Sequence, residues 1–166
     1  MSREVTVISH GLIATAPLNI EKFVGLNWRF LLNERDNRSA ELENVDFSRT
    51  NFVTCFKGCE TRIRGEEKLF RLKEKTNLIR YGATVFMGLW IDYNNCLENS
   101  VLEQLYRVKK ITYVDFFGDL LLSSKRGPYI LGLYRGSDDT WRWLLRKLVR
   151  RWYARNLSAV RIIENT

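Results

Sequence analysis

Hydrophobic and polar positions follow two periods along the chain, and together they predict helices and strands in mixed order. Apolar residues at helical spacing predict a helix over residues 20–32. Alternation over residues 78–93 is the strongest strand pattern. A second helix is predicted at 97–108, and two apolar runs, 111–122 and 128–135, predict a hairpin. Further strands are expected at residues 4–16, 51–56 and 61–72.

Short connections between these elements favour antiparallel strand pairing, because parallel neighbours need longer crossovers. The expected fold class is therefore α+β, with an antiparallel sheet of about five strands packed with two or three helices and ending in a basic amphipathic helix. The length of 166 residues and 45% hydrophobic composition predict one globular domain, residues 1–166. The polar run 33–43 carries charges of both signs and no apolar period, so it is expected to be a mobile loop.

The last long stretch, residues 137–156, combines a polar start with apolar residues at helical spacing. Ser137 and the two aspartates after it can satisfy the first amides of a helix and complement its dipole. A C-terminal basic helix is therefore expected here. Its expected docking face consists of Trp141, Leu145, Leu148 and Trp152.

Basic residues gather on the opposite face of this expected helix, and almost no acidic residue balances them. Arginine suits bidentate contact with phosphate or carboxylate, so this face predicts a docking surface for an anionic partner. The candidate anion-binding residues are Arg142, Arg146, Lys147, Arg150 and Arg151, with Lys125 and Arg126 at the turn of the predicted hairpin. The alternative is a solvated face that only maintains solubility. A formal net charge of +8 favours nucleic acid, anionic membrane or acidic protein as partner without selecting one of them.

Residues suited to catalysis or metal binding are sparse. The single histidine, His10, adjoins Ser9, but neighbours on a strand point to opposite faces. The three cysteines, Cys55, Cys59 and Cys96, could join His10 around zinc, although Cys-x3-Cys is an atypical spacing. No enzymatic activity, cofactor or metal is therefore expected. The odd number of cysteines and the lack of an apolar signal core favour the cytosol or nucleus.

The order of predicted elements resembles that of the matrix proteins of rhabdoviruses. The likeness consists of an early strand closed by Pro17, the helix 20–32, a polar loop, strands within 51–93, the short helix 97–108 and the hairpin 111–135. Locally it is greatest from residue 84 to residue 127. The chain lacks the lysine-rich tail and proline-rich motifs that the family often carries, and it adds the basic C-terminal stretch. These departures indicate a short type such as those of plant-infecting members.

The resemblance implies a non-enzymatic protein that self-associates, condenses the helical nucleocapsid and bridges it to the inner leaflet of the envelope. The implied partners are the nucleocapsid protein with its RNA, further copies of the chain, an anionic membrane surface and an envelope glycoprotein tail. The implied location is the virion beneath the envelope, and the host cytoplasm or nucleus. The alternative is a small basic viral host antagonist of the silencing-suppressor type, which would bind RNA directly. Large assemblies favour the first function, and a stable monomer or dimer that protects RNA favours the second.

Overall fold

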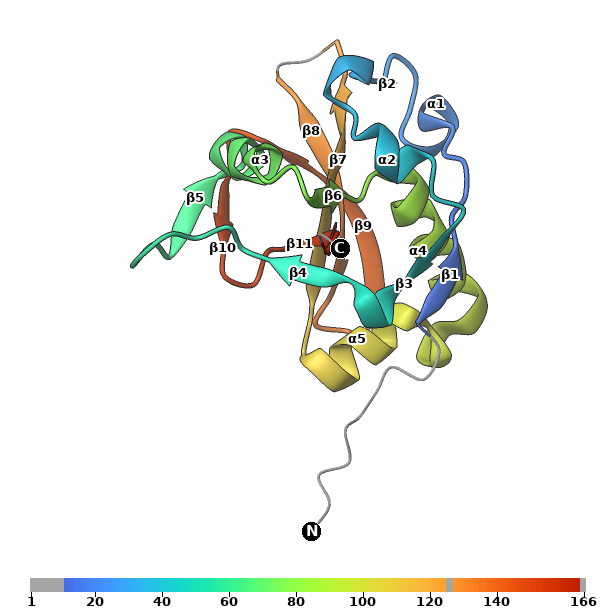
Figure 1. Ribbon diagram of the computed structural model, residues 1–166. Helices are drawn as coiled ribbons and strands as arrows, with labels where there is room; N and C mark the ends of the chain where they lie inside the picture. The colour runs from blue at the N-terminus through green and yellow to red at the C-terminus, as the bar shows by residue number, and fades with distance from the viewer. Residues whose placement is uncertain (1–10, 125–126, 165–166) are drawn as a thin grey trace.

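The computed structural model describes residues 11–124 and 127–164, which form a mixed α and β fold around an open sheet (Figure 1). The helices are α1 (Ile20–Phe23), α2 (Asn37–Ala40), α3 (Gly65–Glu74), α4 (Ala83–Cys96) and α5 (Val101–Lys109), with 3-10 turns at Leu32–Glu34, Phe47–Arg49 and Leu97–Asn99. The strands are β1 (Leu12–Ala14), β2 (Arg29–Phe30), β3 (Asn44–Asp46), β4 (Asn51–Val53), β5 (Arg62–Arg64), β6 (Leu78–Arg80), β7 (Tyr113–Leu122), β8 (Tyr129–Arg135), β9 (Trp141–Lys147), β10 (Arg151–Tyr153) and β11 (Leu157–Ile162). The expected α+β class is thus confirmed.

The main sheet of the described residues has seven strands, and its longest path runs β4, β11, β7, β8, β9. The short strands β2 and β6 join it beside β7 and β11. Strand β11 pairs with β7 in parallel, whereas the other pairs are antiparallel. The expectation of about five antiparallel strands was therefore too simple. Two further antiparallel pairs, β1 with β3 and β5 with β10, lie outside the main sheet.

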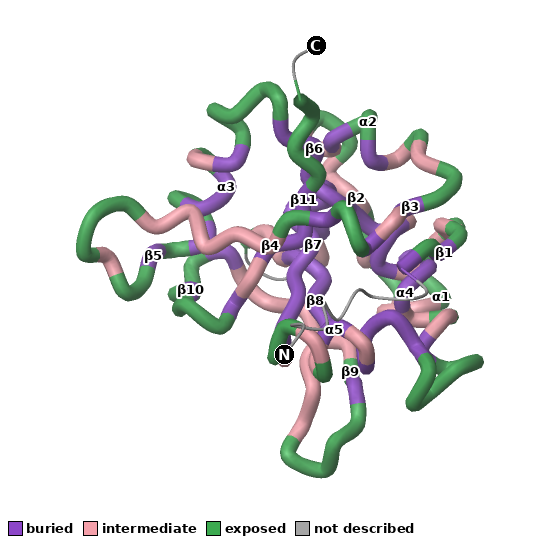
Figure 2. Tube along the Cα trace, turned by 60° about the horizontal axis from the view of Figure 1, so that its bottom comes forward, coloured by how far each residue is buried: buried purple, intermediate pink, exposed green. Residues whose placement is uncertain are grey.

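The main sheet separates two apolar clusters, so both of its faces are covered. The larger cluster packs α4 and α5 against one face and includes Phe86, Leu102 and Phe116, each fully buried. The smaller cluster lies on the other face, between α3, β10 and the sheet, and centres on Phe117 and Trp152. Figure 2 shows β7 as an almost continuously buried trace with the pair β5 and β10 extending away from it. This arrangement places β5 and β10 at the periphery of the molecule.

Residues 78–93, predicted to be one strand, instead form β6 followed by α4. Most of this segment is apolar because both elements are largely buried, and period alone cannot separate a buried strand from a buried helix. Gly88 marks the helix packing: a Cβ there would lie 2.3 Å from the carbonyl oxygen of Ala14. Likewise, the predicted strand 61–72 is present only as β5, because α3 begins at Gly65.

The predicted helix 20–32 stops after one turn, at Phe23. Gly25 has φ +152° and Asn27 has φ +71°, and neither value is compatible with a continuing right-handed helix. In contrast, the predicted helix 97–108 and the predicted hairpin 111–135 are confirmed as α5 and as β7 with β8. Ser100 caps α5 by accepting a hydrogen bond from the amide of Glu103 at 3.3 Å.

The predicted C-terminal basic helix, residues 137–156, is wrong: the segment forms a turn, β9, a second turn and β10. Its sequence also alternates in twos, with Trp141, Trp143 and Leu145 facing the larger cluster. Pairing along the whole length of β8 offers β9 a ladder of backbone bonds and a buried face, which outweighs helical propensity. The resulting fold has strands where the sequence predicted its main functional helix.

The predicted mobile loop 33–43 is instead held by buried polar contacts. The carboxylate of Asp36 accepts hydrogen bonds from the backbone amide of Arg80 at 2.9 Å and from the guanidinium of Arg38 at 3.1 Å. The hydroxyl of Ser39 accepts a bond from the amide of Gly82 at 2.9 Å. Arg35 pairs with Asp119. Residues 33–43 therefore lack an apolar pattern because polar contacts, rather than apolar packing, hold this segment in place.

The close approach of β7 to β6 yields the first prediction. A Cβ on Gly118 would lie 2.3 Å from the backbone oxygen of Arg80, whereas a Cβ on Gly132 would lie 3.2 Å from the Tyr113 hydroxyl. Gly118→Ala should lower the free energy of unfolding by about 1–3 kcal/mol or more. The control Gly132→Ala should change it by less than about 1 kcal/mol. Urea unfolding measures both, and equal effects would contradict the close approach.

The Asp36 network yields a prediction on pH. Burial alone would raise the pKa of Asp36, but the hydrogen bonds from Arg38 and the Arg80 amide outweigh it and lower the pKa below its usual 3.8. The stability that the carboxylate contributes is present above that value and is lost as the pH falls through the lower folded pKa. Asp36→Asn should therefore be less stable at neutral pH and lose less further stability on acidification. The matched control is Glu41→Gln, an exposed carboxylate nearby. Thermal unfolding at a series of acidic pH values measures the stability of wild type, Asp36→Asn and Glu41→Gln. Parallel curves of stability against pH for wild type and Asp36→Asn would contradict the prediction.

Candidate anion-binding surface

The pair β5 and β10 presents arginines directly opposite each other on its outer face. In its register Arg151 lies opposite Arg64, and Tyr153 lies opposite Arg62. The intervening residues Ile63 and Trp152 point inward and are buried. Because opposed residues of an antiparallel pair share a face, the four outer side chains form one surface. The strand pair that carries this surface projects from the body of the protein beside α3 (Figure 1).

The turn before β10 adds to this surface and is fixed by the start of α3. The amide of Gly65 donates to the carbonyl oxygen of Arg150 at 3.0 Å, and the amide of Glu66 donates to that of Leu148 at 3.2 Å. These two carbonyl groups satisfy first-turn amides that a helix leaves free. Gly65 is required there, since a Cβ would lie 2.4 Å from the Trp152 ring. The turn therefore holds Arg150 next to the ribbon.

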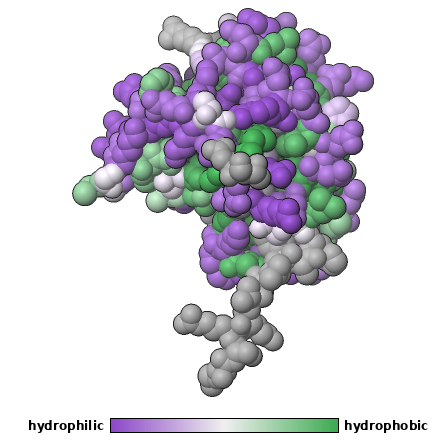
Figure 3. Space-filling model, viewed as in Figure 1, coloured by the Kyte–Doolittle hydropathy of each residue, from purple (hydrophilic) through white to green (hydrophobic). Residues whose placement is uncertain are grey.

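We call the resulting surface the arginine patch. It consists of Arg62, Arg64, Arg146, Arg150, Arg151 and Tyr153. Part of it lines a hollow of about 390 Å³. In Figure 3 the region over α3, β5 and β10, at the left of the view, is mostly hydrophilic, with a few apolar residues among the hydrophilic ones. The patch is thus an exposed basic surface on a rigid framework.

No arginine of the patch has a carboxylate oxygen within 4.0 Å among the residues that the structure describes, although Arg146 acts on the buried Asp115 over a longer distance. Every ion pair within 4.0 Å involves other cations, such as Arg71 with Glu60 and Arg142 with Asp138. Like charges directly opposed on a strand pair destabilise it, so the pair Arg64 and Arg151 has an electrostatic cost. An anionic partner would relieve that cost. Arginine also offers the bidentate geometry that phosphate and carboxylate match.

The structure brings together only part of the predicted anion-binding set. Arg146, Arg150 and Arg151 belong to the patch. Arg142 is paired with Asp138 in the turn before β9. Lys147 lies on the opposite face of β9, with its Nζ 5.7 Å from the ring centre of Tyr129. Lys125 and Arg126 lie outside the described residues.

The residues of the predicted docking face are buried, except for the half-buried Leu145, and are divided between the two clusters. Trp141 and Leu145 pack in the larger cluster, and Leu148 and Trp152 pack in the smaller one. The apolar character of these residues was thus inferred correctly, while their shared helical face was wrong. The division follows from the alternation of side chains along a strand and from the turn at residues 148–150.

Arg62, Arg64 and Tyr153 were missed as site residues. Their signal is present in the sequence as two short alternating triplets, Arg-Ile-Arg and Arg-Trp-Tyr, each with one apolar centre. Such triplets are too short to assign strands on their own, and only the fold places one opposite the other. The contribution of β5 therefore depends on a contact between residues distant in sequence.

A buried charged cluster lies directly beneath the patch. Asp115 is completely buried in β7 and accepts hydrogen bonds from Ser158 Oγ at 2.5 Å and from Trp152 Nε1 at 2.6 Å. Lys68 Nζ lies 3.8 Å from the same carboxylate and donates to the carbonyl oxygen of Asn156 at 2.7 Å. Above this cluster, the guanidinium of Arg146 lies 4.6 Å from the centre of the Trp152 ring. The indole therefore separates a surface cation from a buried anion and contacts both.

Burial shifts the pKa values of this cluster towards the neutral forms. The pKa of Asp115 is raised by burial, although Lys68, Ser158 and Trp152 favour the carboxylate. The pKa of Lys68 is lowered by burial, and Asp115 opposes that shift. Burial also raises the pKa of Tyr113. Ser158, which is fully buried and bonded to Asp115, lacks the access to substrate that a nucleophile needs.

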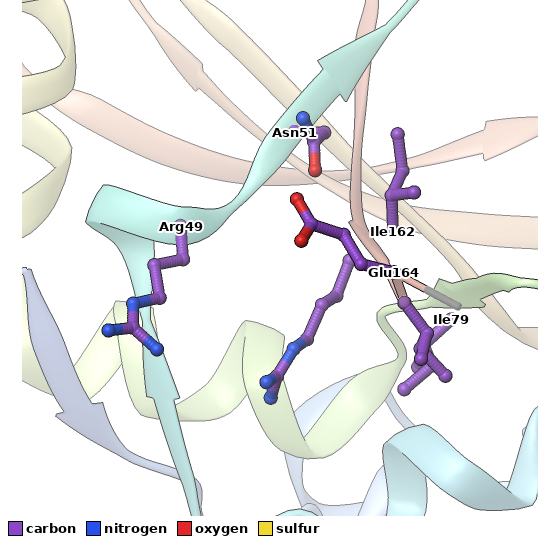
Figure 4. Close-up of a pocket in the computed structure, with 7 residues that line it drawn as sticks. Arg49, Asn51, Ile79, Ile162 and Glu164 are labelled. Carbon is purple, nitrogen blue, oxygen red and sulfur yellow. The ribbon is translucent and has the colours of Figure 1, made fainter. Parts of the chain in front are cut away.

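A larger hollow of about 860 Å³ opens between β4, β6 and the end of β11 (Figure 4). Arg49 and Arg161 line it together with Glu164, Asn51 and isoleucines of β6 and the chain end. The carboxylate of Glu164 lies within the hollow, and its negative charge would repel an anion there. Arg49 also lies 3.9 Å from Asp46, so it is already partly compensated. The arginine patch is therefore the stronger candidate for an anionic partner.

Within the described residues, no group of three or more His, Cys, Asp or Glu side chains is arranged to hold a metal ion. None of the helices in that part of the chain combines the length and the apolar composition needed to cross a membrane. Comparison with family models, curated proteins and solved structures finds no match.

The buried cluster yields a prediction with a control in the same helix. Lys68→Met removes the cation from the neighbourhood of Asp115 and should lower the free energy of unfolding by about 3 kcal/mol at neutral pH. The loss should shrink on acidification, because a protonated Asp115 needs no counter-charge. The control Lys73→Met removes an exposed ion pair with Glu34 and should cost less than about 1 kcal/mol. Urea unfolding tests this, and a Lys68→Met protein as stable as the control would contradict it.

Proposed function

We propose that this chain is a non-enzymatic matrix-type protein that binds an anionic partner through the arginine patch and self-associates to cover it. The observation that carries the proposal is that the exposed patch arginines Arg62, Arg64, Arg150 and Arg151 have no carboxylate oxygen within 4.0 Å in the described structure. Of the predicted order of elements that resembles rhabdovirus matrix proteins, the structure retains the short helix α5 and the hairpin of β7 and β8, and this retained part supports a viral setting. In that setting the partners are the nucleocapsid with its RNA and the inner leaflet of the envelope.

The charge of the patch is suited to both partners. Each arginine or lysine near an anionic lipid surface contributes about 1 kcal/mol, and each phosphate contact with RNA releases condensed counterions. Such contacts are weak for one molecule and become strong when assembly repeats them along a surface. Self-association is therefore part of the proposed function.

A second candidate function is direct binding of RNA by a host antagonist. Tyr153 favours it, because this aromatic side chain lies among the arginines and is 41% exposed, so a base could stack on it. The two functions differ in stoichiometry. Sheets, tubes or higher oligomers on anionic vesicles support the matrix function, and a stable monomer or dimer that binds only RNA supports the antagonist.

The test of the patch removes three of its charges. The variant Arg64→Gln, Arg150→Gln, Arg151→Gln should fold with unchanged or slightly higher stability, because it relieves repulsion between like charges. Its binding to vesicles containing phosphatidylserine should weaken by about 3 kcal/mol, roughly a hundredfold. The salt dependence of its binding to single-stranded RNA should be shallower by about 2 in log-log slope.

The matched control removes three exposed charges elsewhere: Lys22→Gln, Arg29→Gln, Lys75→Gln. Both variants lower the formal net charge of +8 by three, so a non-specific effect of total charge would weaken them equally. Co-sedimentation with vesicles and fluorescence anisotropy with labelled RNA measure binding. If the patch variant binds as the control does, the arginine patch is not the anion-binding surface.

A further inference from the structure

The outer edge of β9 has backbone groups without partners. The hairpin of β8 and β9 is bonded between Gly136 and Thr140 at one end, 2.8 Å, and between Leu148 and Pro128 at the other, 3.1 Å. Bonded pairs alternate in an antiparallel ladder, so the amides and carbonyl groups of the even-numbered residues of β9 point towards β8. Those of the odd-numbered residues point outward. The main sheet ends at β9 on this side.

Three residues leave this edge open. The outward amide of Trp141 donates to the hydroxyl of Tyr93 at 3.0 Å. The carbonyl oxygen of Lys147 accepts a hydrogen bond from the amide of Arg150 at 3.0 Å. Within the described residues, no hydrogen bond is found for the outward amides of Trp143, Leu145 and Lys147 or for the outward carbonyl groups of Trp143 and Leu145. These residues are half-buried, as expected for a strand with one covered face and one free edge. Proteins commonly protect a free edge with proline, bulges or charges, and of these devices β9 has only the cations Arg142, Arg146 and Lys147.

We infer that β9 pairs with β9 of a second copy of the chain in an antiparallel arrangement about a two-fold axis at Leu145. This inference deepens the proposed function by assigning a surface to its self-association. Two copies of the same edge strand form an isologous contact, in which each backbone donor of one copy meets an acceptor of the other and the reverse. With Leu145 on the axis, Trp143 lies opposite Lys147 of the second copy. Each of the three bonded pairs exchanges two hydrogen bonds. The central pair uses only unpaired groups, and in the two outer pairs the carbonyl oxygen of Lys147 accepts a second bond besides the one from the Arg150 amide.

The free groups and the charges select this register. Centring the pair on Leu144 or on Trp143 requires the amide of Trp141, which already donates to Tyr93. Centring on Leu144 also places Arg142 opposite Arg146 of the second copy, and like charges in that position destabilise the pair. The Leu145 register instead places Arg146 opposite Leu144. It brings the ammonium of Lys147 to the ring of Trp143, a favourable cation–π neighbour.

The test is site-directed crosslinking. In a background with Cys55, Cys59 and Cys96 changed to serine, Leu145→Cys places two thiols opposite each other, with Cα atoms about 5.5 Å apart and within disulfide range. Mild oxidation should convert it to a disulfide-linked dimer. The control Val149→Cys is well exposed, at 51%, but its two copies would be roughly 27 Å apart in this register. It should remain largely uncrosslinked.

A second variant tests the backbone contacts. The amide of Leu145 points outward, so Leu145→Pro removes no bond to β8 and should keep the circular dichroism of the folded protein. It should raise the dissociation constant for self-association by roughly tenfold or more, because it removes hydrogen bonds on the two-fold axis. Sedimentation equilibrium over a range of protein concentrations measures this constant.

The outcomes separate this inference from the proposed function. Selective crosslinking at residue 145 supports the β9 pairing. A protein that self-associates without crosslinking at 145, or that crosslinks equally at 145 and 149, refutes the β9 pairing and leaves self-association to another surface. A chain that stays monomeric at all concentrations, on vesicles as well as in solution, refutes both. Binding by the patch is measured separately and does not depend on this result.

Discussion

A carboxylate buried at the centre of a sheet must be compensated, and Asp115 imposes this requirement on one face of the molecule. Its partners come from three elements: Lys68 on α3, Trp152 on β10 and Ser158 on β11. Each partner is itself buried, so the loss of any one of them leaves Asp115 less compensated in a low dielectric. Asp115 therefore fixes α3 and β10 on the sheet, and with them the pair β5 and β10 that presents the arginines.

The same framework explains how the molecule tolerates its arginine patch. Repulsion between Arg64 and Arg151 would separate a free two-stranded ribbon, because such ribbons are only marginally stable. Here the inward residue Trp152 is held by Asp115 and packs on Phe117, and Gly65 packs against the same indole. Stability lost on the outer face is thus offset by burial on the inner face. A surface maintained against its own repulsion is suited to binding an anionic partner.

Sequence patterns predicted the elements whose signals are local. α5 begins with a serine cap followed by a clear amphipathic period, and β7 and β8 are apolar runs on either side of a glycine-containing turn. The predictions that failed share one cause. Where an element is buried on all sides or is held by residues distant in sequence, its own sequence carries no clear helical or strand period. α4 is apolar all round, β9 has both a helical and a strand pattern, and residues 33–43 are held by Asp36 and Arg80 rather than by apolar contacts. The basic residues of the C-terminal stretch were identified, but Arg62 and Arg64 joined them only through the fold.

The positions of the patch and of the free edge of β9 relate the two proposals physically. Residues directly opposite in an antiparallel ladder point to the same face, so pairing about Leu145 places Arg146 of both copies on the α3 face of a continuous sheet. The helices α4 and α5 of both copies then lie together on the other face. The dimer would therefore present two arginine patches in one direction. When a flat anionic surface or a polymer reaches both patches, binding at the first patch gives the second a high effective concentration of the same partner. Binding to such a partner therefore becomes stronger when two copies pair.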